Sequence, residues 1–210
     1  ALLKEKESDI SSWRTDPDMA GRSNCVGDLG SHIENTVKYI TGLEIESLCA
    51  NLDSFLKDVK LDNNAEIIVR YDNGARGLYW CSQIAVGNDN AFKIRIFGTR
   101  GSLEWSHEKP EILKVNYLNK PEQILKRGRD KLYSPAEDFS RIPPGHPEGF
   151  FEAFSNIYLK YTAALMKKKK GLEINECDMD FPSVEEGVSG VKFINYCVDS
   201  SEKGVEWVDL

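Results

Sequence analysis

An aspartate and a histidine lie four residues apart in SNCVGDLGSH, residues 23–32. The apolar residues that follow recur at helical spacing as far as Gly42, which predicts a short amphipathic helix over residues 30–41. Side chains four residues apart share one face of a helix. We therefore expect Asp28 and His32 to face one cavity. There a histidine exchanges a proton with a substrate hydroxyl, and a neighbouring carboxylate stabilises the charged imidazole.

Two interpretations of this pair stay open. In the simpler one, Asp28 caps the helix and His32 is an ordinary surface or core side chain, because aspartate is common at helix N-termini. The polar surroundings favour the functional interpretation, since Arg14 and Asp16 precede the helix and Asn24 lies at its start. Such a set resembles a polyol site, where many hydroxyls need fixed polar partners.

A second unusual cluster is PPGHPEG, residues 143–149, which places His146 between prolines just before a helix that begins at Pro147. The prolines hold this histidine stiffly, which makes it a candidate functional residue. The alternative is a rigid junction with a solvent-facing imidazole. His107 lies in a polar turn without a second ligand at metal spacing, so no metal site is expected.

Charge and cysteine content limit the partners and the compartment. The 210 residues carry 27 Lys and Arg against 34 Asp and Glu, a net charge of -7, which argues against a surface that binds nucleic acid. Five cysteines without a CxxC pair favour a reducing, cytoplasmic setting, although Cys25 near the helix start is also a candidate reactive thiol. No run approaches the ~20 apolar residues that span a bilayer, so no membrane contact is expected.

The order of elements indicates the fold class. Asn73-Gly74 is a strong hairpin signal between two strands, and a helix over residues 183–200 follows the one at Pro147. Its expected buried residues include Val184, Val188 and Val191. The other predicted strands cover residues 43–56, 91–98, 111–118 and 120–126, with a short one at the end. This order predicts one α+β domain over residues 1–210, with a large, mostly antiparallel open sheet and helices packed on one face.

The strand over residues 76–86 has few charges on either face. One face is expected under the helices and the other under a partner subunit, which predicts a homo-oligomer built through the sheet. The alternative is an ordinary, partly exposed face.

Several segments resemble the C-terminal half of the glucose-fructose oxidoreductase/inositol dehydrogenase/MocA (Gfo/Idh/MocA) family. They are WRTDPDMAGRSNCVGDLGSHIENTVKYITGLEIESL, GTRGSLEW, PPGHPEGFFEAFSNIY and FPSVEEGVSGVKFINYCVDSSEKGVEWVDL. The resemblance extends from Trp13 to Leu210. It implies a dehydrogenase of sugars or cyclitols that uses NAD or NADP. Such a protein has an N-terminal Rossmann domain and a C-terminal α+β domain whose sheet mediates oligomerisation.

The resemblance also implies roles for single residues. The family's Asp-xxx-His pair falls on Asp28 and His32. His32 would take the hydroxyl proton as hydride leaves for nicotinamide, and Asp28 would orient or tune it. The substrate contacts implied in the same way are Arg14, Asp16, Asn24 and His146.

One departure from the family pattern is the missing nucleotide loop. No GxGxxG follows a predicted strand, and the family's catalytic Glu-Lys-Pro lysine belongs to the Rossmann half. Glu108-Lys109-Pro110 repeats that tripeptide beyond the GTRGSLEW strands, so Lys109 receives no catalytic role.

We therefore expect residues 1–210 to be the substrate-binding and oligomerisation domain of a longer protein whose Rossmann domain this chain lacks. By itself the chain would bind no cofactor and would not turn over, because hydride transfer needs a nicotinamide held beside the substrate. The alternative is a non-enzymatic carbohydrate-binding or assembly module with the same fold.

Overall fold

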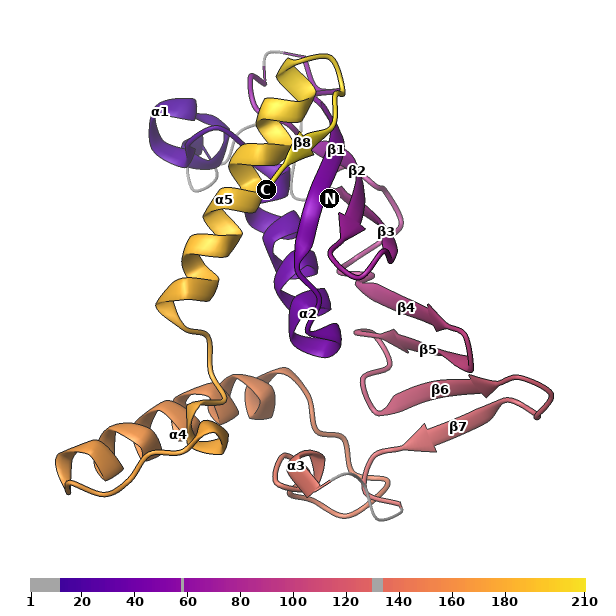
Figure 1. Cartoon of the computed structure of the whole chain (residues 1–210), viewed down its shortest axis with the longest axis vertical. Coiled ribbons are helices and arrows are strands. Elements are labelled where there is room, and N and C mark those ends of the chain that lie inside the picture. Colours follow the sequence, from indigo (N-terminus) through magenta and orange to yellow (C-terminus); the bar gives the residue numbers. More distant parts are fainter. Residues whose placement is uncertain (1–11, 58, 130–133) are drawn as a thin grey trace. The chain divides into compact units, whose positions relative to one another are not determined.

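The computed structural model describes residues 12–57, 59–129 and 134–210. The chain forms two compact units, one made of the described residues up to Asn88 together with Pro182–Leu210, the other of Asp89–Phe181. Both units combine helices with antiparallel strands (Figure 1). The predicted α+β class is confirmed, and the strands are divided between two four-stranded sheets.

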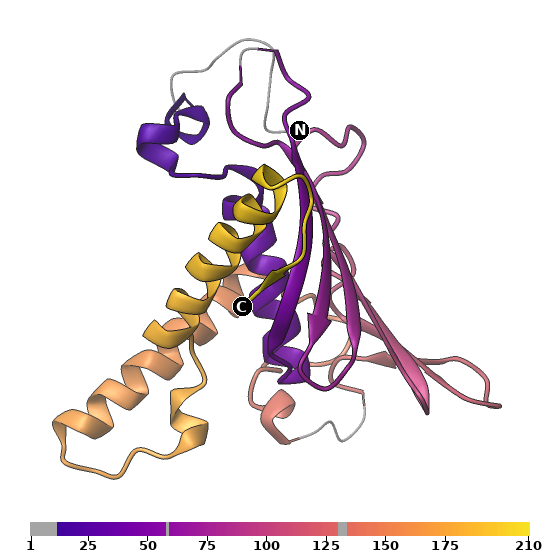
Figure 2. The same ribbon diagram turned by 45° about the horizontal axis from the view of Figure 1, so that its top comes forward.

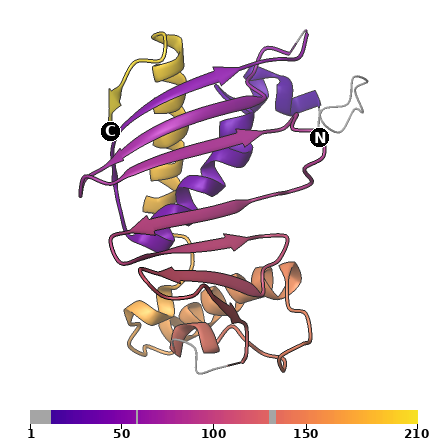
Figure 3. The same ribbon diagram turned by 90° about the vertical axis from the view of Figure 1, so that its right-hand side faces the viewer.

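The first unit holds a sheet with strand order β3-β2-β1-β8 and two long helices. Its elements are η1 Ser12–Thr15, α1 Pro17–Ala20, η2 Val26–Gly30, α2 Ser31–Thr41, β1 Ile45–Asp53, β2 Asn64–Tyr71, β3 Arg76–Ser82, α5 Val184–Glu202 and β8 Val208–Asp209. Figures 2 and 3 show α2 and α5 against the same face of this sheet.

The predicted hairpin joins β2 to β3. Gly74 takes a positive φ of 85°, and its amide donates to the Tyr71 carbonyl at 2.9 Å. The side-chain oxygen of Asn73 accepts from the Ala75 amide at 2.9 Å. The turn therefore needs glycine at its left-handed position, which explains why the Asn-Gly signal was informative.

Alternation along the strands builds the core of this unit. Leu48, Ile67 and Tyr79 point toward the helices, and Phe193 of α5 packs against them. Tyr71 and Tyr79 share a hydrogen bond between their hydroxyls, so neither buried phenol is left without a partner. Buried side chains from the sheet, the segment at Cys25 and α5 form one continuous hydrophobic cluster.

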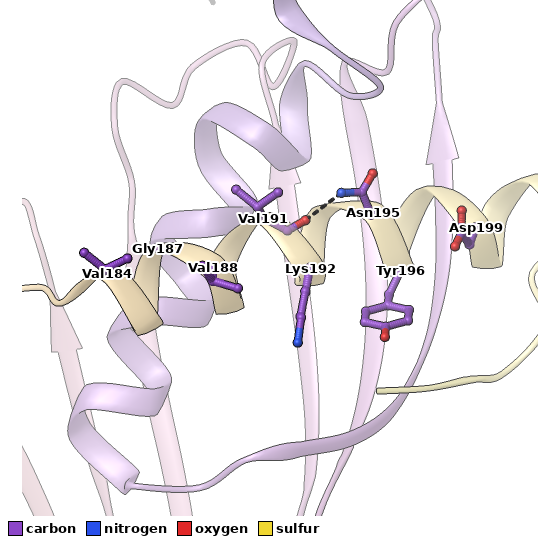
Figure 4. A pocket seen from close by; sticks show the side chains of 8 residues that line it. All are labelled: Val184, Gly187, Val188, Val191, Lys192, Asn195, Tyr196 and Asp199. Carbon is purple, nitrogen blue, oxygen red and sulfur yellow. Dashed lines mark hydrogen bonds between the residues drawn. The ribbon is translucent and has the colours of Figure 1, made fainter.

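The predicted buried face of α5 is wrong for its first half. Val184, Val188 and Val191 are 79%, 50% and 59% exposed, and they line a groove of about 720 Å³ along the helix (Figure 4). Burial is confined to the second half, where Phe193 and Cys197 meet the sheet. The apolar residues recur at helical spacing along the whole of α5, although its first half lies outside the core. Periodicity alone therefore predicted too long a buried face.

Helix side chains complete the edge of β1. The short strand β8 pairs only with Ser47 and Leu48. Further along β1, the amides of Ala50 and Leu52 donate to the hydroxyls of Ser200 at 2.9 Å and Ser201 at 3.1 Å. These two serines of α5 satisfy strand amides that would otherwise be buried without an acceptor.

The second unit contains a sheet with strand order β4-β5-β6-β7. Its elements are β4 Lys93–Gly98, β5 Gly101–Ser106, β6 Ile112–Tyr117, β7 Gln123–Lys126, α3 Ser134–Glu137, α4 Phe150–Lys169 and η3 Glu176–Met179. The helix expected from Pro147 begins at Phe150, because the Glu152 carboxylate accepts from the Gly149 amide at 2.9 Å and caps that end. None of the helices in the described parts of the chain is long and apolar enough to cross a membrane.

Candidate functional site

The helical segment that carries Asp28 and His32 begins earlier than predicted. A π-helical turn, η2, runs directly into α2, and the Ser31 amide donates to the Val26 carbonyl across it. Asp28 lies inside this turn and His32 lies in the first turn of α2. Single π turns are frequent at functional sites, where the wider turn changes the direction of a side chain.

Asp62, a residue distant in sequence, holds the start of this segment. Its buried carboxylate accepts from the amides of Asn24 at 2.8 Å and Val26 at 3.0 Å, and from the Ser23 hydroxyl at 3.0 Å. The first amides of a helix have no partner within the helix, so the carboxylate does the work of an N-cap. Sequence reasoning missed Asp62 because it lies 38 residues from Asn24 and outside any local capping pattern.

A pair of buried amides lies next to this cap. The side chains of Asn24 and Gln83 bond to each other in both directions, at 2.8 and 3.1 Å. Gln83 also donates to the Asp28 carboxylate at 3.3 Å. Gln83 was another residue that sequence reasoning missed. The available signal was a polar side chain on the same strand face as Tyr79 and Cys81.

Two further candidates lie beside Asp28. The Arg14 guanidinium is 4.0 Å from the Asp28 carboxylate, and both side chains remain partly exposed, at 40% and 30%. Arg14 also stacks over the Trp13 ring, with its guanidinium carbon 5.2 Å from the ring centroid. Asp16 caps α1 by accepting from the Asp18 amide at 3.0 Å. The structure thus brings Arg14, Asn24 and Asp28 together.

His32 is exposed on α2, one turn beyond Asp28. Among the described residues, the Asp28 carboxylate has Arg14 and Gln83 as partners, and neither a hydrogen bond nor an ion pair joins it to His32. The carboxylate is therefore fixed, while the imidazole is open to solvent and accessible to a ligand. The roles assigned to both residues stay predictions.

His146 belongs to the second unit, in the loop before α4. Its side chain is exposed, its ring Nδ1 lies 3.3 Å from the Pro143 carbonyl, and its own carbonyl accepts from Arg127 at 2.6 Å. Its backbone is held in place, and its contact with substrate stays a prediction.

The cysteine near the candidate site does not have the environment of a nucleophile. Cys25 and Cys81 are buried beside each other, and their mutual hydrogen bond together with burial raises the pKa of the Cys25 thiol well above its usual range. Burial likewise raises the pKa of Cys197. The protonated, unreactive form is therefore favoured. In the described part of the chain, no group of three or more His, Cys, Asp or Glu side chains is arranged to hold a metal ion.

Comparison with known proteins gives this geometry a family context. Residues 3–104 match the model of the GFO/IDH/MocA C-terminal domain. The chain is 34% identical over 208 residues to the uncharacterized oxidoreductase YfiI of Bacillus subtilis, a match that covers 98% of this chain and 53% of that protein. The chain belongs to the GFO/IDH/MocA oxidoreductase family.

Solved structures of this family share the fold. An inositol dehydrogenase homolog from Azotobacter vinelandii, complexed with NADH and myo-inositol, is 33% identical with a TM-score of 0.86, and the match covers 97% of this chain and 53% of that one. A levoglucosan dehydrogenase complexed with NADH and levoglucosan has a TM-score of 0.77 at 23% identity, covering 95% of this chain and 53% of that one, and shows the fold alone. The chain thus spans about half the length of these relatives.

Proposed function

We propose that this chain is the substrate-binding and assembly domain of an NAD-dependent dehydrogenase that acts on a hydroxyl of a sugar or cyclitol. The observation that carries the proposal is the Asp28 carboxylate, held by Arg14 and Gln83 one turn before the exposed His32. Support for the substrate class and for NAD comes from the inositol dehydrogenase homolog, whose structure contains NADH with myo-inositol.

Each polar residue of the first unit has a part in this proposal. His32 takes the substrate hydroxyl proton on an imidazole nitrogen, and the negative charge of Asp28 stabilises the imidazolium that results. Arg14 donates hydrogen bonds to other hydroxyls of the polyol, and Asp16 accepts from them. Asn24 adds a polar contact and, through its pairing with Gln83, fixes the turn that carries Asp28.

We propose that NAD is held by a segment outside residues 1–210, since this chain has no glycine-rich nucleotide loop. A bound NAD supplies the acceptor for the hydride of the oxidised carbon. The contribution of this chain is to hold the substrate hydroxyl beside His32 and to remove its proton.

The test uses the full-length protein that contains this chain, assayed with NAD against a panel of cyclitols and sugars. His32→Ala is expected to lower kcat by about 10²–10⁴-fold, the usual contribution of a general acid or base, with little change in NAD affinity. His107→Ala is the matched control and should retain activity. Equal losses of turnover and NAD binding in His32→Ala would contradict the role of His32 as general base. A wild-type protein that binds a polyol but does not turn it over would favour the non-enzymatic module.

We also propose that the uncovered face of the first sheet joins copies of the chain. Leu78 and Trp80 of β3 are 74% and 58% exposed, and Ile68 of β2 beside them is 46% exposed. The Trp80 indole donates to the Asn64 side-chain oxygen at 3.0 Å, which restrains the ring on this face. Apolar side chains gathered on one sheet face are typical of protein interfaces.

Light scattering after size-exclusion chromatography tests this interface. The wild type is expected to be an oligomer and Trp80→Glu a smaller species, with Lys203→Glu, an exposed position directly after α5, as the control. A wild type that stays monomeric at high concentration would remove the proposal.

The five free cysteines support a reducing, cytoplasmic setting, which fractionation of the native cells would test.

A further inference from the structure

Arg127, which follows β7 in the second unit, lies at the centre of a network of hydrogen bonds. Its side chain is only 15% exposed, and no sequence motif marks it as functional. Three of its bonds go to one loop, and they end on the Ser140 hydroxyl at 2.9 Å, the Ile142 carbonyl at 3.0 Å and the His146 carbonyl at 2.6 Å. A planar guanidinium with five donors can hold several acceptors in one fixed geometry.

Two carboxylates also bind the guanidinium. Glu111 accepts from Arg127 Nε at 3.0 Å, and Glu148 lies 2.5 Å from Arg127 Nη1. Glu111 also accepts from the Glu148 amide at 2.8 Å, and Glu148 accepts from the Arg141 amide at 3.0 Å. Both ends of the loop, at residues 141 and 148, are therefore tied to the same charged group.

The loop has few other means of keeping its path. His146 and both prolines before it are exposed, and Gly145 takes a positive φ of 89°. Exposed loop backbone loses about 1–2 kcal/mol of conformational entropy for each residue that is fixed. The prolines limit local freedom, but the position of His146 relative to the sheet depends on the bonds to Arg127.

We propose that Arg127, clamped by Glu111 and Glu148, is the positioning residue that fixes the loop of residues 140–148 and places the His146 imidazole for contact with substrate. The second half of this statement rests on the proposed function and on the prediction, made from the sequence, that His146 contacts substrate. The first half concerns the chain alone and has its own measurement.

The measurement on the chain alone uses its three histidines, whose ring resonances are resolved by NMR and assigned with His146→Ala. Arg127→Lys keeps the positive charge but loses the planar guanidinium that donates to the loop. The His146 resonance is therefore expected to shift and broaden, while that of His107 stays unchanged. Arg129→Lys, a nearby exposed position, is the control and should alter neither. An unchanged His146 resonance in folded Arg127→Lys protein would overturn the clamp. If Arg127→Lys does not fold, Ser140→Ala removes one bond of the same set and is judged by the same criterion.

The measurement on the full-length enzyme is a double-mutant cycle. Arg127→Lys is expected to lower kcat/KM about tenfold, because hydrogen bonds from a charged donor are lost. The loss should appear mostly in KM, since the proposed contact of His146 is with bound substrate. Combined with His146→Ala, it should add no further loss, since both changes act through the same contact. Additive losses would overturn the positioning role. If His146→Ala leaves kcat/KM unchanged, the proposed substrate contact is refuted, and the resonance shift alone decides the clamp.

Discussion

Replacing Asp62 should release the turn that carries the candidate site. Its carboxylate accepts from two buried amides and one hydroxyl, at 2.8, 3.0 and 3.0 Å. A hydrogen bond to a charged group contributes about 1.5–3 kcal/mol, and an N-cap substitution costs about 0.5–2 kcal/mol. The three bonds share one group and removal also relieves the burial of a charge, so Asp62→Ala is expected to cost about 3 kcal/mol of the free energy of unfolding.

Urea unfolding followed by tryptophan fluorescence measures this loss. Asp62→Asn keeps one acceptor oxygen and should cost about half as much, roughly 1–2 kcal/mol. Asp72→Ala, at an exposed position after β2, is the control and should stay within about 0.5 kcal/mol of the wild type. An Asp62→Ala protein as stable as the control would refute the reasoning that this carboxylate caps the segment.

Three further predictions concern buried or bonded polar groups. Burial raises the pKa of Glu34 above its ordinary 4.5, so the protein loses stability as the pH rises and this buried side chain becomes charged. Glu34→Gln should therefore raise the melting temperature at pH 7 but not at pH 4, as calorimetry would detect. Gln83→Leu leaves Asn24 without its partner and should cost about 2 kcal/mol in urea unfolding, with a lower kcat/KM in the full-length enzyme; unchanged stability would contradict this. The Glu148 amide, and then Arg127, lower the pKa of Glu111 below 4.5, so its stabilising effect is present above that pH and lost as the pH falls. The difference between wild type and Glu111→Gln should accordingly shrink in acid unfolding curves.

Local patterns predicted most of the elements. The helix after Ser31, the hairpin at Gly74 and the α5 helix are all present, because hydrophobic periodicity and turn chemistry are properties of neighbouring residues. The sequence also placed Asp28 and His32 one turn apart, a spacing that any helix through both residues would give.

Contacts between distant residues were not predictable in this way. Nothing near Asp62 indicates that it caps a helix that begins before it in the chain, and nothing near Arg127 indicates that it binds a loop carrying His146. Likewise, the apolar stripe of α5 is continuous in sequence, and only packing decides that its second half is buried.

The sequence by itself determined which segments become helices and strands, and which polar residues lie near one another along the chain. Only the tertiary structure decided which carboxylate is fixed, which amides pair and which loop is clamped. The physical reason is that a hydrogen bond is selected by distance and direction in space, and many residues in a chain of this composition offer equivalent donors and acceptors.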